Sequence, residues 1–366
     1  MDVSSESPLA RMVRTTPTNF WNDSCSLADL EYAIAHGGVG ATSNPTIVGE
    51  VLRREWEVWH PRILALQAAD PSATDVEIAW RLIETMATGA AALLEPIFDR
   101  ERGRKGRLSI QTNPTFHGSS EHMLEQGLRF HELAPNIQVK FPATPAGITA
   151  IEEATAAGVS INATVSFTLS QALAVGEAVE TGLRRRVAAG HDVSAMSPVC
   201  TLMVGRLDDW MKVVADRDDI VVDPGALDRA GIAVLKKAAP IYRARGYRTR
   251  LLAAAYRHHL HWSELIGGDI ILTIPPLWQR RFNGSRVEVR PRFDEPVDVR
   301  LVDELLDRLP DFRRAYDEDG LAPNEFVSYG ATVRTLRGFI ASYWDLVRTV
   351  DDVMLPNPDT LRGGTR

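Results

Sequence analysis

Short strand-like runs alternate with longer helical segments along most of this chain. The candidate strands are residues 19–21, 40–43, 107–111, 137–140, 160–165, 199–204, 250–254 and 270–272. The segments between them have apolar residues at helical spacing and natural stops, as in the helix predicted from Pro145 to Ala157, which is followed by Gly158. Strands that alternate with helices predict a parallel α/β architecture, either an open doubly wound sheet or a closed barrel.

The closed barrel fits the sequence better than the open sheet. The glycine-rich stretch Gly37–Gly40 lacks the spacing of a dinucleotide-binding fingerprint. A (β/α)8 barrel needs about 250 residues, and this chain has 366. We therefore predict a TIM barrel with additional helices. Its parts are an N-terminal segment (1–18), the barrel (19–284) with a helical insertion at about 50–100, C-terminal helices packed on the barrel (285–356) and a polar tail (357–366).

The last of these helices is predicted over residues 331–354. In this prediction Trp344, Leu346 and Val347 lie along one side of the helix.

Composition excludes several classes of protein. The net charge of −7 argues against nucleic acid or an anionic membrane surface as a partner. No apolar run is long enough to span a bilayer, and residues 1–18 do not resemble a secretory signal. The two cysteines, Cys25 and Cys200, are too few for a disulfide scaffold. We expect a cytoplasmic protein.

One lysine has an unusual position. Of the five lysines, only Lys140 stands at the end of an apolar strand-like run, Asn136-Ile-Gln-Val-Lys-Phe-Pro. Burying an ammonium group is costly, so this placement suggests a chemical role. The alternative is a lysine whose stem packs on the protein while its amine reaches water.

Polar residues follow the other predicted strands at the end where a barrel enzyme has its active site. These residues are Asp23, Asn44, Gln111, Asn162, Thr164, Thr201 and Arg257. They surround one amine and include neither a metal-ligand cluster nor a Ser-His-Asp order. A lysine in that setting suits a Schiff base with a carbonyl substrate, without metal or organic cofactor.

Five segments in order resemble motifs of the transaldolase family, over residues 19–276. They are GATSNPTI at 40–47, NIQVKFPATPAG at 136–147, SINATVSF at 160–167, VGR at 204–206 and ILTIPP at 271–276. They resemble, in turn, the family's GVTSNPTI turn, its Schiff-base strand, its VNVTLIFS strand, the strand end that presents a phosphate-binding arginine, and its NTMPP stretch.

The resemblance implies a role for each matching residue. Lys140 would form the imine with a ketose, and Asp23 would exchange the proton of its C4 hydroxyl. A water held by Gln111 and Thr164 would serve imine formation and hydrolysis. The remaining positions would bind substrate: Asn44, Asn162 and Thr201 its hydroxyls, Met203 the wall of the site, and Arg206 and Arg257 the phosphate.

Three positions depart from the family pattern. Gln111 stands where transaldolases usually have glutamate, and it cannot exchange a proton. Related fructose-6-phosphate aldolases also carry glutamine there, but they pair it with a tyrosine that acts as the acid. In this chain Met203 stands at the position of that tyrosine. Ala255 replaces a serine of the phosphate site. These changes predict a shifted donor or acceptor rather than a housekeeping enzyme of the pentose phosphate pathway.

Alternatives stay open for several residues and for the function. Asn44 could shape a turn, Asp23 could cap a helix, and Arg206 could be a structural ion-pair partner. His258, His259 and His261 have no carboxylate beside them in sequence, so we expect no metal site; they follow the phosphate-site strand and could line the acceptor pocket.

The function predicted is transfer of a dihydroxyacetone unit from a ketose, with a ketose phosphate expected, to an aldehyde, by a monomer or homodimer. The alternatives are an aldolase without group transfer, and a degenerate transaldolase that binds a sugar phosphate without turnover.

Overall fold

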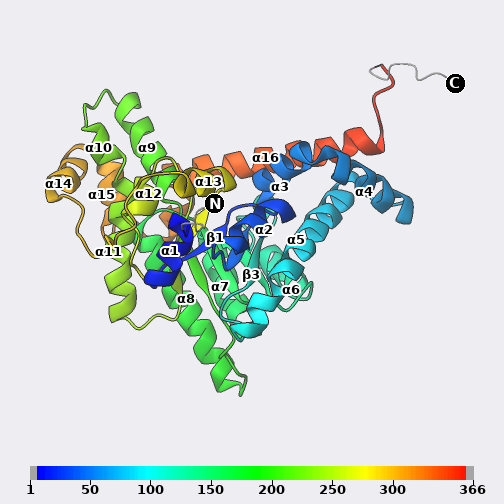
Figure 1. Ribbon diagram of the computed structural model, residues 1–366, viewed down its shortest axis with the longest axis horizontal. Coiled ribbons are helices and arrows are strands. Elements are labelled where there is room, and N and C mark those ends of the chain that lie inside the picture. The colour runs from blue at the N-terminus through cyan, green and yellow to red at the C-terminus, as the bar shows by residue number, and fades with distance from the viewer. Residues whose placement is uncertain (1–5, 360–366) are drawn as a thin grey trace, which may run out of the picture.

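Eight parallel strands close into a barrel in the computed structural model, which describes residues 6–359 (Figure 1). The strands are β1 (Asn19–Asn22), β2 (Gly40–Thr42), β3 (Arg107–Gln111), β4 (Ile137–Pro142), β5 (Ile161–Ser166), β6 (Val199–Leu202), β7 (Arg250–Ala253) and β8 (Ile271–Ile274). Each strand pairs with the next in the chain, and β8 pairs with β1 from Asn19↔Ile271 to Asn22↔Ile274. The predicted (β/α)8 barrel is confirmed, and the open sheet is excluded.

Helices precede, separate and follow the strands. The α-helices up to the fifth strand are α1 (Pro8–Thr15), α2 (Leu27–Ala35), α3 (Pro45–Arg54), α4 (Trp56–Ala69), α5 (Asp75–Arg100), α6 (Ser120–His131) and α7 (Pro145–Ala157). Those that follow are α8 (Leu169–Ala188), α9 (Val204–Arg217), α10 (Pro224–Leu227), α11 (Ala230–Ala244), α12 (Leu260–Ser263), α13 (Pro276–Asn283), α14 (Val299–Arg308), α15 (Pro310–Tyr316) and α16 (Gly330–Met354). Two 3₁₀ turns are η1 (Pro114–Phe116) and η2 (Pro323–Ser328).

The ends of the chain are described only in part. The predicted N-terminal segment and polar tail include residues 1–5 and 360–366, which lie outside the described residues. Within the N-terminal segment, α1 buries Leu9 and Met12, and the Leu9 main-chain N–H donates to Asn283 at the end of α13 (3.1 Å). Within residues 6–359, no helix combines the length and the apolar character that crossing a bilayer requires.

Two helix starts at the carboxyl ends of the strands are fixed by side-chain caps. Asn44 accepts a hydrogen bond from the Ile47 main-chain N–H at the start of α3, and Thr144 accepts one from Gly147 at the start of α7. Both helices have proline in the first turn, where the missing N–H costs nothing. These caps set the chain reversals after β2 and β4 at the rim of the barrel.

The barrel interior is filled rather than hollow. Trp21, Val199, Leu252 and Ile271 form an inner cluster, with Ala254 above them. Gly40 lies against the indole of Trp21, where a Cβ atom would come within 2.6 Å of the ring. This packed layer closes the barrel below the rim.

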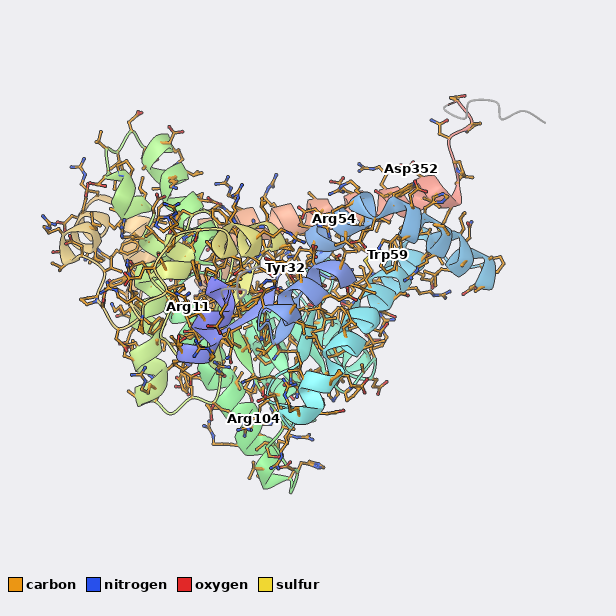
Figure 2. All side chains as sticks on the ribbon, viewed as in Figure 1. Arg11, Tyr32, Arg54, Trp59, Arg104 and Asp352 are labelled. Carbon is orange, nitrogen blue, oxygen red and sulfur yellow. The ribbon has the colours of Figure 1, made fainter. Side chains whose placement is uncertain are left out.

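The added helices form two groups. One group, α3 to α5, lies between β2 and β3 and begins at Pro45. The other group follows the barrel, and its last helix, α16, packs on α3 and α5. Figure 1 shows α16 running beside α3, and Figure 2 labels Arg54 and Trp59 in the same region. Thr46 of α3 and Ser342 of α16 share a hydrogen bond of 2.9 Å.

Two details of the sequence prediction were wrong. The sixth strand ends at Leu202, and Val204 already belongs to α9, because Met203 leaves the extended conformation (φ −85°, ψ 70°). On α16, Leu346 and Val347 are buried, but the Trp344 side chain is 47% exposed. Trp344 and Leu346 are two residues apart, which places them on nearly opposite sides of a helix.

Candidate active site

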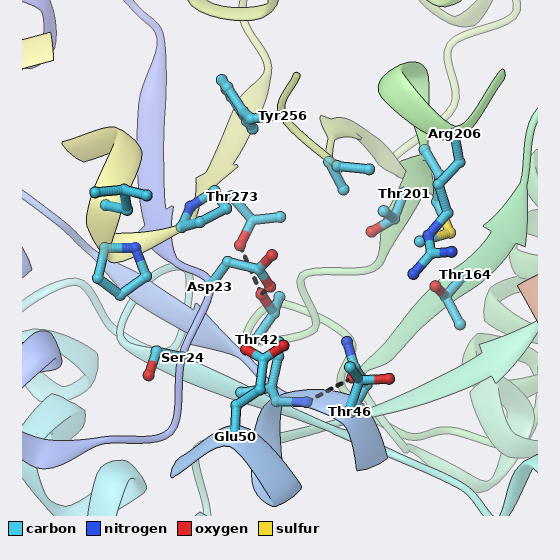
Figure 3. Close-up of a pocket in the computed structure, with 18 of the residues that line it drawn as sticks. Asp23, Ser24, Thr42, Thr46, Glu50, Thr164, Thr201, Arg206, Tyr256 and Thr273 are labelled. Carbon is cyan, nitrogen blue, oxygen red and sulfur yellow. Dashed lines mark hydrogen bonds between the residues drawn. The ribbon is translucent and has the colours of Figure 1, made fainter. Parts of the chain in front are cut away.

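A cavity of about 320 Å³ opens at the carboxyl ends of the strands. It is lined by eight of the ten residues selected from the sequence: Asp23, Asn44, Lys140, Thr164, Thr201, Met203, Arg206 and Arg257. Figure 3 shows Asp23 and Thr42 on one side of this pocket, and Thr164, Thr201 and Arg206 on the opposite side. The cavity therefore has an acidic wall facing a basic one.

Lys140 is buried in the middle of the site. Its side chain comes from β4, where it is in register with Gln111 of β3 and Asn162 of β5. The residue is 5% exposed, and its Nζ donates to the main-chain carbonyl of Ser43 at 3.2 Å. Burial lowers the pKa of Lys140 to about 8; the Arg206 charge adds to this effect, and Asp23 opposes it. A large fraction of the amine is then neutral and nucleophilic near pH 8.

Asp23 follows β1 and is held by two threonines. Thr42 Oγ1 donates to Asp23 Oδ1 at 2.6 Å and lies 2.6 Å from Thr273 Oγ1, so Thr273 completes a short hydrogen-bonded chain. Burial raises the pKa of Asp23, although the Lys140 charge and the Thr42 hydrogen bond oppose this rise. Asp23 does not cap a helix, since Ser26 caps α2. Its raised pKa suits a group that takes and returns a proton.

Gln111 and Asn162 lie outside the main cavity. Gln111 faces a small neighbouring hollow beside Asn44 and Trp80. Asn162 is fully buried, donates to Ser109 Oγ (3.1 Å) and accepts from Thr201 (2.7 Å). Gln111 Oε1 and Thr164 Oγ1 are buried without a hydrogen-bond partner in the described part of the chain. The two oxygens come from the strands that flank Lys140 but face different hollows, Thr164 the main cavity and Gln111 the small one.

The two arginines at the site have different environments. Arg206, on the first turn of α9, has no ion-pair partner within residues 6–359, and its guanidinium lies 5.2 Å from the centre of the Phe339 ring. Burial, assisted by the Arg257 charge, lowers its pKa. Arg257 is more exposed and forms a two-pronged ion pair with Asp209 (2.7 Å). Arg206 thus has no ion-pair partner among the described residues, which favours binding of an anion.

Three alternatives left by the sequence concern Asn44, Arg206 and Lys140. Asn44 both caps α3 and lines the cavity. Arg206 is not a structural ion-pair partner in the described chain, and the amine of Lys140 is buried rather than solvent-exposed.

The histidines lie away from the cavity, contrary to the sequence expectation. His259 is exposed, whereas His258 and His261 approach a carboxylate that is distant in sequence, Asp208. The three side chains offer ligand atoms within 4.8 Å of one another. However, Nδ1 of His261 accepts the Arg257 main-chain N–H (3.1 Å), so its Nε2 carries the ring proton towards Asp208 (2.7 Å). Because neither nitrogen of His261 has a free lone pair, this cluster is a hydrogen-bond network rather than a metal site.

Comparison with known proteins identifies the family of this chain. The family model "Transaldolase/Fructose-6-phosphate aldolase" matches residues 20–306. Transaldolase 1 of Streptomyces avermitilis is 32% identical over 277 residues, which cover 68% of this chain and 71% of that protein. The chain belongs to the transaldolase/fructose-6-phosphate aldolase family. Transaldolase of Thiobacillus denitrificans is 29% identical, covering 74% of this chain and 80% of its own length. Transaldolase of Mycobacterium tuberculosis (strain ATCC 25618 / H37Rv) is 30% identical over 56% of this chain and 55% of that protein.

Several residues at this transaldolase-family site were missed in the sequence. Thr42 and Thr273, which support Asp23, both lie inside quoted motifs, and the alternation of inward-facing positions along β2 and β8 would have indicated them. Asp208 and His261 carry no local signal, because they are 53 positions apart. Ala255 lines the cavity in a left-handed conformation (φ 69°), which the sequence does not suggest for alanine.

Proposed function

We propose that this chain transfers a three-carbon dihydroxyacetone unit from a phosphorylated ketose to an aldehyde, through an imine on Lys140. The observation that carries the proposal is the buried Lys140 amine, whose pKa is lowered to about 8, in a cavity that also contains Asp23 and Arg206. Family membership supports the same reaction class.

Each catalytic step has a candidate group in this cavity. The neutral Lys140 amine attacks the C2 carbonyl, and loss of water gives the imine. Asp23 then takes the proton of the C4 hydroxyl while the C3–C4 bond breaks, and the aldehyde product leaves. The bonding electrons remain on the three-carbon unit as an enamine. This enamine attacks the acceptor aldehyde, Asp23 returns the proton, and water releases the new ketose.

Substrate binding uses the opposite wall. Arg206 and Arg257 are positioned for the distal phosphate, since a guanidinium pairs with two of its oxygens. Thr201 and Asn44 reach the cavity and are assigned to the sugar hydroxyls, while Met203 contributes an apolar part of the wall. Asn162 acts from beneath, through its hydrogen bond with Thr201.

The departures at Gln111, Met203 and Ala255 favour a specialised substrate. Gln111 and Thr164 can orient a water but cannot give it a proton, so imine formation and hydrolysis are expected to be slower than with a glutamate. We therefore propose a donor or acceptor other than the common pair fructose 6-phosphate and erythrose 4-phosphate. Turnover of that pair at rates typical of enzymes, about 10 per second, would contradict this part of the proposal.

The cellular setting belongs to the same proposal. The sequence expectations are a cytoplasmic enzyme and a monomer or homodimer. Light scattering on the purified protein distinguishes the two assemblies, and a larger oligomer would contradict both.

A coupled transfer assay tests the function. The protein is incubated with a ketose phosphate, with and without an aldehyde acceptor, and the released aldehyde is measured. We expect release that depends on the acceptor and disappears in Lys140→Met. Release of free dihydroxyacetone without acceptor would instead indicate an aldolase. Binding of the ketose without any product, from folded protein and across several donors and acceptors, would indicate the non-catalytic alternative.

A further inference from the structure

We infer that Asp208 and His261 form a buried pair that positions the Arg257 loop and thereby sets the affinity of the site for phosphorylated sugars. The inference rests on the proposed function, because it assigns Arg257 to the substrate phosphate. It makes Asp208 and His261 positioning residues, neither of which reaches the cavity.

A continuous chain of hydrogen bonds links this pair to Arg257. The Arg257 main-chain N–H donates to His261 Nδ1 at 3.1 Å, and His261 Nε2 donates to Asp208 Oδ2 at 2.7 Å. The other carboxylate oxygen, Oδ1, accepts the Gly231 main-chain N–H at 2.8 Å. Both side chains of the pair are completely buried. The carboxylate is therefore fixed by α11 on one side and holds the histidine on the other.

The loop that carries Arg257 has no regular secondary structure. Residues 254–259, between β7 and α12, have no helical or extended structure, and Ala255 is in the left-handed region (φ 69°). The loop packs directly on α9: a Cβ atom on Gly205 would lie 1.8 Å from the Ala255 carbonyl oxygen. Its conformation is thus set by contacts with α9 rather than by local sequence preference.

A single helix controls both phosphate arginines. Arg206 is on α9 itself, Asp209 of α9 holds the Arg257 side chain, and Asp208 of α9 holds the Arg257 main chain through His261. Two guanidinium groups bind one phosphate only at a defined separation, so this shared anchor fixes the width of the anion site.

The protonation states of Asp208 and His261 favour a stable hydrogen bond between them. Burial, together with the Arg257 charge, lowers the pKa of His261 despite the neighbouring carboxylate, so the ring is neutral at pH 7. Burial by itself would raise the pKa of Asp208, but the nearby His258 ring (3.4 Å) and the hydrogen bond from His261 bring it below its ordinary value. A buried carboxylate without such partners would be strongly unfavourable.

Three variants and one control test the inference by binding and by kinetics. His261→Phe keeps an aromatic ring but removes both hydrogen bonds, Asp208→Asn keeps the shape of the carboxylate but removes its charge, and His261→Asn retains an oxygen able to accept the Arg257 N–H. The matched control is His259→Asn, at an exposed histidine on the same loop. Calorimetry measures affinity for inorganic phosphate, and kinetics give KM and kcat for a ketose phosphate. Borohydride trapping of dihydroxyacetone on Lys140 gives a readout that needs no phosphate.

We expect His261→Phe to weaken phosphate binding and raise the KM for the ketose phosphate about tenfold, with kcat nearly unchanged, the factor typical of one impaired charge-assisted contact. Asp208→Asn should also weaken phosphate binding and raise KM. His261→Asn should keep most of the wild-type phosphate affinity, and His259→Asn should leave both phosphate affinity and KM unchanged. Trapping of dihydroxyacetone stays at the wild-type level in all four.

The outcomes separate the inference from the proposed function. Wild-type phosphate affinity in folded His261→Phe and Asp208→Asn would overturn the inference; should His261→Phe fail to fold, Asp208→Asn decides. Loss of dihydroxyacetone trapping in proportion to phosphate affinity would also overturn it, because the pair would then act on the whole site. Absence of trapping in the wild type would reject the proposed function, while phosphate calorimetry would still test the pair.

Discussion

At the scale of single residues, the site depends on the cost of burying one ammonium group. Lys140 is 5% exposed, and burial lowers its pKa to about 8. Asp23 is the nearby carboxylate whose charge partly offsets that cost. A lysine held in this way is reactive because burial destabilises its charged ammonium form relative to the neutral amine.

The first prediction concerns pH. Imine formation needs the neutral amine, so the rate of trapping with dihydroxyacetone should rise with pH and reach half its maximum near pH 8, where Lys140 loses its proton. The measurement is the yield of borohydride-reduced adduct between pH 6 and 10. A midpoint near 10, the ordinary value for lysine, would contradict the proposed environment.

The second prediction concerns stability. The folded-state pKa of about 8 lies below the unfolded value of about 10.4, so burying the charged amine costs up to about 3 kcal/mol below pH 8. That cost falls as pH rises from 8 towards 10.4. Lys140→Met should therefore have a higher free energy of unfolding than wild type at pH 7, and the gain should shrink towards pH 10. Urea denaturation at both pH values checks this, and a variant less stable at pH 7 would refute it.

At this scale the sequence predicts the residues at the strand ends but misses the buried pair beside the Arg257 loop. Strand ends identify Lys140, Asp23 and Thr164, because parallel strands bring their carboxyl ends to one rim. The buried Asp208–His261 pair could not be predicted, because it joins α9 to α12 and has no spacing within either segment.

At the scale of elements, α9 organises the phosphate side of the site. Its first turn carries Arg206, and Gly205 beside it allows the Ala255 carbonyl to approach closely. The sequence analysis predicted that the sixth strand runs through Val204. In the structure α9 begins at Val204, so Arg206 belongs to a helix, which the prediction missed.

The third prediction tests this packing. Gly205→Ala would place a methyl group 1.8 Å from the Ala255 carbonyl oxygen, so the Arg257 loop must move. We expect a loss of stability of about 1–3 kcal/mol and weaker ketose phosphate binding, with dihydroxyacetone trapping retained. The control is Gly338→Ala on α16, where nothing lies within 4 Å of the new Cβ. That change should stabilise by up to about 1 kcal/mol, and equal effects of the two changes would contradict the account.

At the scale of the whole molecule, the terminal helix α16 contacts both the helices around the barrel and a side chain of the site. α16 packs on the α3–α5 insertion, and its Phe339 contacts the Arg206 guanidinium. The sequence predicts both groups of helices, but it does not predict that a residue from the end of the chain supports a side chain in the cavity. Such a contact depends on tertiary packing, which has no local pattern.

The fourth prediction concerns this contact. Phe339→Leu keeps an apolar side chain but removes the aromatic face beneath Arg206, so we expect a KM for the ketose phosphate raised about two- to fivefold, for a loss of about 0.5–1 kcal/mol. kcat should change little, and Trp344→Leu, on the exposed side of α16, should leave KM unchanged. A lower kcat with an unchanged KM would place the effect elsewhere.

The central claim is that Lys140 carries the reacting carbon unit, and one measurement tests it directly. The protein is incubated with dihydroxyacetone or a ketose phosphate, reduced with borohydride, digested and weighed peptide by peptide. We predict a three-carbon adduct on the peptide that contains Lys140 and none in Lys140→Met. An adduct on another lysine, or none from folded protein with any donor, would contradict the account.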